Sequence, residues 1–160
     1  MTLIIRQAGP DDASPLGRLG AMLIRTHYEF DRHRFLAPRA GAEEGYAAFL
    51  RGVIDSHDDR VFVAEQDGVI VGYVYAALEP LSWKELRGPA GFIHDIAVEE
   101  RARRAHVARR LLSAALAWLR ERGAPRVVLW TATQNAPAHA LFRSLGFRDT
   151  MTEMTLDFEE

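Results

Sequence analysis

Arginines gather between Val98 and Leu112, where an apolar segment gives way to an amphipathic one. Arg101, Arg103 and Arg104 fall in the connection between the two segments. The first backbone N–H groups of a helix have no partner within the helix, and the helix dipole places partial positive charge at the same end. This stretch therefore predicts an anion site at a helix N-terminus, which suits a phosphorylated ligand.

The composition is that of an ordinary globular chain, and it limits the possible chemistry. The 160 residues suffice for one core, so we expect a single domain over residues 1–160. A formal net charge of −2 provides no overall field for binding nucleic acid or an anionic membrane. No cysteine is present, which excludes disulfides, thiolate zinc sites and cysteine nucleophiles.

The sequence also predicts where the chain resides. Its first residues turn polar too soon for a signal peptide, and no apolar run approaches the roughly 20 residues of a membrane span. We therefore expect a cytoplasmic protein with no membrane partner and no nucleic-acid partner.

Two helices are expected to follow a first short strand. The strand covers residues 3–7, and Asp11 or Asp12 can cap the next helix. Residues 28–35 are dense in aromatic and charged side chains and are expected to form a functional loop. The second helix is expected to bury the side chains of Tyr46, Phe49, Leu50 and Val53.

Strands and helices are expected to alternate in the rest of the chain. Residues 60–66 and 69–77 read as strands, and Asp67-Gly68 between them predicts a type I′ turn. A third strand over 91–98 leads into the arginine-rich helix. The remaining elements are a strand at 126–131, a helix capped by Asn135, and one or two strands within 147–158.

The order β-α-α-β-β-β-α-β-α-β(-β) predicts an α/β (α+β) mixed sheet with helices on its faces. This order and two sequence blocks resemble the GCN5-related N-acetyltransferase (GNAT) superfamily. The first block, Arg103-Arg104-Ala105-His106-Val107-Ala108, is similar to the family signature of Arg or Gln, two residues, Gly, one residue, and Gly or Ala. The second block consists of Asn135, Ala138, Phe142 and Gly146-Phe147. The resemblance spans nearly the whole chain and implies a mostly antiparallel central sheet.

The resemblance implies that acetyl-CoA is the acyl-donor cosubstrate and that no metal takes part. Backbone N–H groups of residues 104–109 would hold the pyrophosphate, and the pantetheine would pair with the strand edge at 96–98. The residues implied in acyl-CoA binding are Ile96, Ala97, Val98, Arg103, Arg104, Ala105, His106, Val107, Ala108, Arg109, Asn135 and Phe142.

The implied reaction is N-acetyl transfer to a primary amine, foremost of a small molecule, by direct attack in a ternary complex. The amine must first lose a proton. Phe92 occupies one position that the family commonly uses for a base, so His94 and Asp95 are the catalytic candidates. An imidazole has an ordinary pKa of about 6.5, which favours His94 as the base, while Asp95 would orient water or bind an ammonium group.

Strand geometry is expected to separate these two candidates. Regular alternation places His94 and Asp95 on opposite faces, so only one of them would face the substrate, although the bulge common in the family alters alternation. A backbone N–H near Ile96, freed by that bulge, is the expected donor to the oxyanion.

Two positions depart from the family pattern. His106 stands where glycine is usual, and either a left-handed backbone or an ordinary first helical turn is open to it. Phe142 stands where tyrosine is common and cannot protonate the leaving thiolate, a task that would pass to Tyr73, Tyr75 or water.

The acceptor wall is expected to combine the 27–35 segment, the central hairpin and the loop around Trp83. Acidic groups there would attract a cationic amine. The substrate-binding candidates are Tyr28, Phe30, Asp31, Tyr75 and Glu79.

Other functions stay open from the sequence. One is a non-catalytic or weakly catalytic acyl-CoA-binding regulatory module, and another is a protein or peptide N-acetyltransferase. A homodimer is also open, either through the last strands or through another edge.

Overall fold

The computed structural model describes residues 2–159, except for the side chain of Arg104. The sheet has five strands in the order β1-β2-β3-β4-β5. In chain order the elements are β1 (Leu3–Gln7), η1 (Pro10–Asp12), α1 (Ala13–Phe30), α2 (Ala42–Ile54), β2 (Asp59–Gln66), β3 (Val69–Glu79), β4 (Ala90–Val98), η2 (Glu100–Ala105), α3 (Val107–Glu121), β5 (Val127–Leu129) and α4 (Ala136–Ser144).

The sheet is mixed, as predicted. Strands β1 to β4 are antiparallel neighbours, and β5 lies parallel to β4 after the α3 crossover. The β2–β3 hairpin turns at Asp67 and Gly68, whose φ angles of 51° and 82° are both positive. Positive φ at both central residues is what a type I′ turn requires, so that prediction is confirmed.

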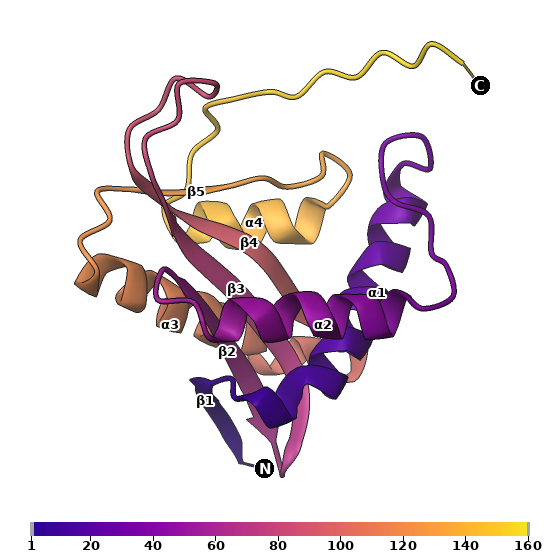
Figure 1. Ribbon diagram of the computed structural model, residues 1–160, viewed down its shortest axis with the longest axis vertical. Helices are drawn as coiled ribbons and strands as arrows, with labels where there is room; N and C mark the ends of the chain where they lie inside the picture. The colour runs from indigo at the N-terminus through magenta and orange to yellow at the C-terminus, as the bar shows by residue number, and fades with distance from the viewer. Residues whose placement is uncertain (1, 160) are drawn as a thin grey trace.

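Helices cover both faces of the sheet (Figure 1). On one face, α1 and α2 pack against Tyr73 and Tyr75 of β3. On the other face, α3 and α4 pack against Val74 and Ala76 of the same strand. Successive side chains of a strand point to opposite faces, which explains why almost all of β3 is apolar and buried.

Three expectations from the sequence are corrected by the fold. No strand forms within 147–159, which extends away from the body (Figure 1), and β5 is shorter than the expected 126–131. Both departures have one reason, because a strand lasts only as far as it has a pairing partner. The expected loop at 28–35 is partly helical, since α1 continues through Phe30.

Phe49 is the other departure, because its side chain is about half exposed. Tyr46, Leu50 and Val53 follow the spacing of one helical face, whereas Phe49 falls beside that face. Its ring meets the edges of the Tyr46 and Tyr75 rings instead of entering the core.

None of the helices within residues 2–159 combines the length and apolarity that crossing a bilayer requires.

Candidate active site

Strand β4 carries a bulge at His94. Tyr75 of β3 lies opposite Asp95, and the next residue, Ala76, lies opposite Ile93, so His94 has no residue across from it. One inserted residue shifts the alternation of side chains by one step. His94 and Asp95 therefore face the same side of the sheet, contrary to the alternation expected from the sequence.

The bulge lies close to the expected oxyanion donor. Ile96 lies opposite Val74 in the ladder, two residues beyond the bulge. Its side chain packs with the core on the α3 side. A backbone N–H near Ile96 as donor to the oxyanion stays a prediction.

The His94 side chain is held from three directions. Its Nε2 lies 2.9 Å from Oε1 of Glu79, the last residue of β3. Its ring stacks on Phe92 at 5.3 Å between centroids and tilts against Tyr75 at 5.0 Å. A glutamate carboxylate only accepts hydrogen bonds, so in the neutral imidazole Nε2 carries the proton and Nδ1 has the lone pair.

Asp95 is bound by two phenols. Its Oδ2 accepts hydrogen bonds from the hydroxyl of Tyr46 on α2 and, at 3.1 Å, from that of Tyr73 on β3. Burial, followed by the charge of Asp95, raises the pKa of both tyrosines well above the ordinary value. The phenols therefore remain neutral donors, and Asp95 ties α2 to the sheet.

A glycine makes room for this contact. Gly20 of α1 lies against the Tyr46 ring, and a Cβ at Gly20 would overlap the ring atoms. The hydroxyl of Tyr46 thus reaches Asp95 because α1 and α2 pack closely at this point.

Neither Tyr75 nor Phe142 presents a free polar group to the site. The Tyr75 hydroxyl donates to Oδ1 of Asp59 at 2.8 Å, and burial raises its pKa. Phe142 is buried in the core on the α3 side, where its ring meets Phe147 edge-on. Of the three proton sources suggested by the sequence, Tyr73 and Tyr75 therefore both donate to carboxylates, and water is left.

Strands β4 and β5 stay paired over only a short distance. Gly91, Phe92 and Ile93 pair with Val127, Val128 and Leu129. From His94 to Val98, β4 has no strand beside it on the β5 side within the described chain. An unpaired strand edge offers N–H and C=O groups to a ligand in extended form.

The anion site predicted from the arginine-rich stretch lies just after this open edge. The 3₁₀ helix η2 ends at Ala105, and α3 begins at Val107. His106 between them has φ 57° and ψ 25°, which is the left-handed of the two conformations left open by the sequence. The Arg110 N–H bonds to the His106 carbonyl, so the N–H groups of the preceding helical residues lack an intrahelical acceptor.

The side chains around this helix start make mostly local contacts. Arg103 Nε donates to the Val98 carbonyl at 3.1 Å, and Arg109 donates to the Ser144 hydroxyl. Val107 is fully buried and fixes the first turn of α3 in the core. The side chain of Arg104 lies outside the described residues.

Asn135 caps α4, as predicted. Its Oδ1 accepts the Ala138 N–H at 3.3 Å. The helix ends before Gly146, whose φ of 98° marks the left-handed position after a helix.

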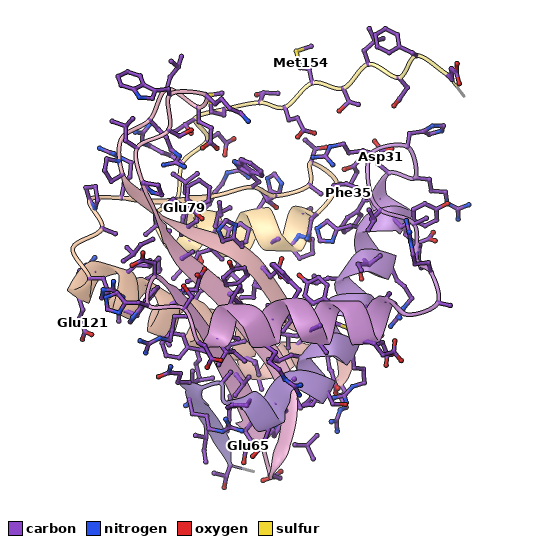
Figure 2. The ribbon with its side chains drawn as sticks, in the orientation of Figure 1. Asp31, Phe35, Glu65, Glu79, Glu121 and Met154 are labelled. Atoms are coloured by element: carbon purple, nitrogen blue, oxygen red, sulfur yellow. The ribbon has the colours of Figure 1, made fainter. Side chains whose placement is uncertain are left out.

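The acceptor candidates fall into two groups. Tyr75 and Glu79 surround His94, whereas Tyr28 and Phe30 lie in the last turn of α1. Asp31 follows them, and its Oδ1 accepts the N–H groups of His33 and Arg34, which fixes the turn. Figure 2 places Asp31 and Glu79 toward one end of the molecule, with Glu65 at the other end.

The sequence did not predict the hydrogen-bond partners of His94 and Asp95, which are Glu79 and Tyr46. Tyr46 was expected only as a core residue, and Glu79 only as an acid that attracts a cation. The hairpin pattern places Glu79 near the strand that carries His94, whereas the contact from α2 to Asp95 depends on tertiary packing alone.

No group of three or more metal-ligating side chains occurs within residues 2–159.

Residues 23–147 match the family model described as the Acetyltransferase (GNAT) family. The chain belongs to this family. It is therefore an acetyltransferase of the GNAT family, and the resemblance seen in its sequence is confirmed.

Two curated relatives are similar in sequence to this GNAT chain. The uncharacterized N-acetyltransferase YhfO of Bacillus subtilis is 27% identical over 147 residues, which cover 91% of this chain and 89% of YhfO. A mycothiol acetyltransferase of Saccharomonospora viridis is 33% identical over 98 residues, covering 60% of this chain and 32% of that protein. This GNAT chain thus aligns with about a third of the mycothiol enzyme.

Solved structures share the GNAT fold with this chain. A mutant of the BH1408 protein from Bacillus halodurans has a TM-score of 0.83 at 21% identity, covering 98% of this chain and 99% of that one. The aminoglycoside N-acetyltransferase AAC(6')-Iy, in complex with CoA, has a TM-score of 0.75 at 18% identity, covering 98% and 94%. At these identities the likeness establishes the fold.

Proposed function

We propose that this GNAT protein is a cytoplasmic enzyme that transfers the acetyl group of acetyl-CoA to a primary amine of a small molecule, by direct attack in a ternary complex. One observation carries the proposal. The bulged His94 lies at the start of an open β4 edge, and the chain runs from that edge through η2 to the N-terminus of α3. Donor, amine and base can meet at this point of the fold.

Acetyl-CoA fits the groups that line this path. Main-chain groups of Ile96 to Val98 can pair with the pantetheine, since no strand within residues 2–159 occupies that edge. Free N–H groups at the start of α3, with the arginines before it, suit the pyrophosphate. Asn135 and Phe142 support the position of α4 beside this region. When bound, acetyl-CoA supplies the activated acyl group as a thioester.

His94 is the base in this proposal, and Glu79 is its positioning residue. The carboxylate of Glu79 fixes the ring and its tautomer, so Nδ1 accepts the proton of the incoming ammonium group. Asp95 is less suited to this task because its Oδ2 already accepts two phenolic hydrogen bonds. We assign Asp95 to holding the strand and α2 in place.

Among the described residues, none of the side chains considered for protonating the departing thiolate is free to do so. Phe142 has no proton to give, and the hydroxyls of Tyr73 and Tyr75 donate to carboxylates. A thiol has an ordinary pKa of about 8.5, so its thiolate leaves readily even when water is the proton source.

We propose a cationic small-molecule amine as acceptor. The carboxylate of Glu79 and the ring of Tyr75 lie beside His94, where they can receive an ammonium group. Tyr28, Phe30 and Asp31 would form a more distant wall at the end of α1. The names of a relative, a mycothiol acetyltransferase, and of a structural neighbour, an aminoglycoside N-acetyltransferase, suggest aminoglycosides and other amino sugars as first compounds to try.

A thiol-release assay with acetyl-CoA and a panel of amines tests the function. The chain contains no cysteine, so every thiol detected comes from CoA. We expect release that depends on the amine, with aminoglycosides, amino sugars, polyamines and short peptides as the panel.

The other outcomes of this assay have defined meanings. Calorimetric binding of acetyl-CoA without release in the presence of any amine would support an acyl-CoA-binding regulatory module. Release with peptides alone would support a protein N-acetyltransferase. Failure to bind acetyl-CoA would contradict both the enzyme and the module.

A further inference from the structure

Aromatic rings form a continuous row on both sides of His94, here called the ring row. In order, its members are Phe49, Tyr75, His94, Phe92 and Trp130, and successive ring centroids lie 6.0, 5.0, 5.3 and 6.2 Å apart. These residues come from α2, β3, β4 and the segment that follows β5. The proposed base therefore lies at the centre of an aromatic surface that crosses the sheet.

The two ends of the ring row are exposed, whereas its inner phenyl and phenol rings are buried. Tyr75 and Phe92 are 8% and 5% exposed, but Phe49 and Trp130 are 49% and 75% exposed. A single exposed aromatic side chain is ordinary in a folded protein. Two of them that lead through buried rings to one imidazole indicate a surface that a ligand covers.

The two exposed ends lie on different sides of the site. Trp130 follows β5, which is the side on which the β4 edge is open to acetyl-CoA. Phe49 lies on α2 and contacts Tyr75, whose hydroxyl donates to Asp59 of β2. In the sheet order β2-β3-β4-β5, Phe49 is thus on the side of His94 away from the donor. An amine that approaches opposite the thioester passes Phe49.

The charges beside the ring row favour a ligand with one ammonium group. The carboxylate of Glu79 is bound to His94, and that of Asp59 accepts the Tyr75 hydroxyl. The Arg87 guanidinium carbon lies 4.7 Å from the centroid of the Phe92 ring, which adds a positive charge to the row. One ammonium group can lie against Glu79 and the Tyr75 ring, whereas a polycation would also be repelled by Arg87.

We propose that the acceptor is an amine carried by an aromatic ring on a short alkyl chain, and that Phe49 determines this specificity by packing against the ring of the acceptor. This inference rests on the proposed acetyl transfer. Phe49 is held by edge-to-face contacts with Tyr46 and Tyr75, so its exposed ring has a fixed position for a further aromatic contact. The alkyl chain then brings the amine along Tyr75 to His94.

Two amines of similar size test the specificity in the thiol-release assay. Phenethylamine and cyclohexylethylamine have the same chain and differ in whether the ring is aromatic. We expect kcat/KM to be about 2- to 10-fold higher for phenethylamine, because an aromatic pair contributes on that scale beyond the area it buries.

Variants at Phe49 separate the aromatic contact from apolar burial. Phe49→Leu is expected to abolish the preference, chiefly by raising KM for phenethylamine, whereas Phe49→Tyr keeps a ring and is expected to retain it. Phe158→Leu makes the same change at another exposed phenylalanine, outside the ring row, and is expected to leave the preference unchanged. Circular dichroism of each variant verifies its fold.

The outcomes distinguish this inference from the proposed function. Equal kcat/KM for the two amines in the unaltered protein overturns the inference, and this measurement needs no variant. A preference that survives in folded Phe49→Leu overturns it as well, as does acetylation of an aminoglycoside with neither ring-bearing amine accepted; acetyl transfer stands in all three cases. Thiol release with no amine at all would overturn the proposed function and the inference together.

Discussion

The imidazole of His94 has one nitrogen bound and one free. Nε2 is engaged by Glu79, and the ring is held between Phe92 and Tyr75, so the free Nδ1 has a defined direction. A base that is oriented by a carboxylate and remains partly exposed can meet an amine that enters from solvent.

Removing the imidazole tests its role directly. We expect His94→Ala to lower kcat/KM for the amine by about 10²- to 10⁴-fold, because general-base catalysis contributes on that order. We also expect the acid limb of the pH–rate profile to disappear. His57→Ala, the same change at an exposed histidine, is the control. A pH profile in His94→Ala that matches the unaltered protein would remove His94 as the base.

Glu79 is expected to act through His94. Glu79→Gln keeps the shape of the side chain and removes its charge, so His94 loses its fixed tautomer and the imidazolium loses its partner. We predict that kcat falls while KM for the amine changes little, because the imidazole is no longer held in one orientation. Glu85→Gln, in the exposed β3–β4 loop, serves as the comparison. A change in KM alone would assign Glu79 to acceptor binding instead.

A second ion pair contributes to stability far from the site. The Arg6 guanidinium, through hydrogen bonds of 2.8 and 3.0 Å, holds the pKa of Asp12 below its ordinary value, with help from the Gly9 N–H. A lowered pKa in the folded state stabilises the protein above the unfolded value of about 4 and loses this effect as pH falls through the folded value.

We predict that Asp12→Asn lowers the free energy of unfolding by about 1–2 kcal/mol at pH 7, a modest figure because Arg6 is partly exposed. The difference from the unaltered protein should narrow as pH falls toward 3. Urea unfolding at several pH values measures it, with the exposed neighbour change Asp11→Asn as control. A difference independent of pH would contradict an electrostatic origin.

At the scale of elements, the start of α3 depends on a residue in an uncommon backbone conformation. His106 has a positive φ, which favours glycine, and it connects η2 to a helix whose first residue, Val107, is fully buried. The sequence alone left two conformations open at His106, because backbone angles follow from how η2 and α3 are joined.

The left-handed backbone of His106 predicts how substitutions there change the free energy of unfolding. We expect His106→Gly to raise the free energy of unfolding by about 0.5–1 kcal/mol, since glycine adopts positive φ without steric cost. We expect His106→Val to lower it by about 1 kcal/mol or more and to weaken acetyl-CoA binding, because a β-branched residue is strained there. Thermal unfolding and calorimetry measure both effects. Equal stability of the two variants would be incompatible with a left-handed His106.

The elements predicted well are those with strong local signals. The Asp67-Gly68 turn and the Asn135 cap each follow from residues that act within one turn of chain. The strands expected within 147–158 and at the far end of 126–131 do not form, because strand formation there depends on a partner rather than on the segment. The site was predicted in part, since the position of a bulge is decided across two strands.

Over the whole molecule, buried phenols donate to carboxylates of the sheet, and one of them, that of Tyr46, links α2 to β4. Three of the four tyrosines, Tyr46, Tyr73 and Tyr75, donate to Asp95 or Asp59, and burial is the main cause that raises their pKa. A raised pKa in the folded state stabilises the protein fully below the unfolded value of about 10. This contribution is lost as pH rises through the folded value.

We therefore predict that the protein loses stability above pH ~10 and that these phenols ionise only as it unfolds. Absorbance of tyrosinate near 295 nm, recorded at pH ~11 with and without guanidinium, should be much larger in the unfolded sample. Tyr73→Phe should reduce the increase on unfolding. Full tyrosinate absorbance in a protein that is still folded would contradict the prediction.

The bulge at His94 divides β4 into two parts that are out of phase. Up to Ile93, the residues that face α3 have odd numbers. From Asp95 onward, the residues that face α3, Ile96 and Val98, have even numbers. Loss or gain of a single residue at this point would turn Ile96 and Val98 away from the α3 side of the sheet and would turn Asp95 toward that side. The number of residues in β4 is therefore fixed at this point by the packing on both faces of the sheet.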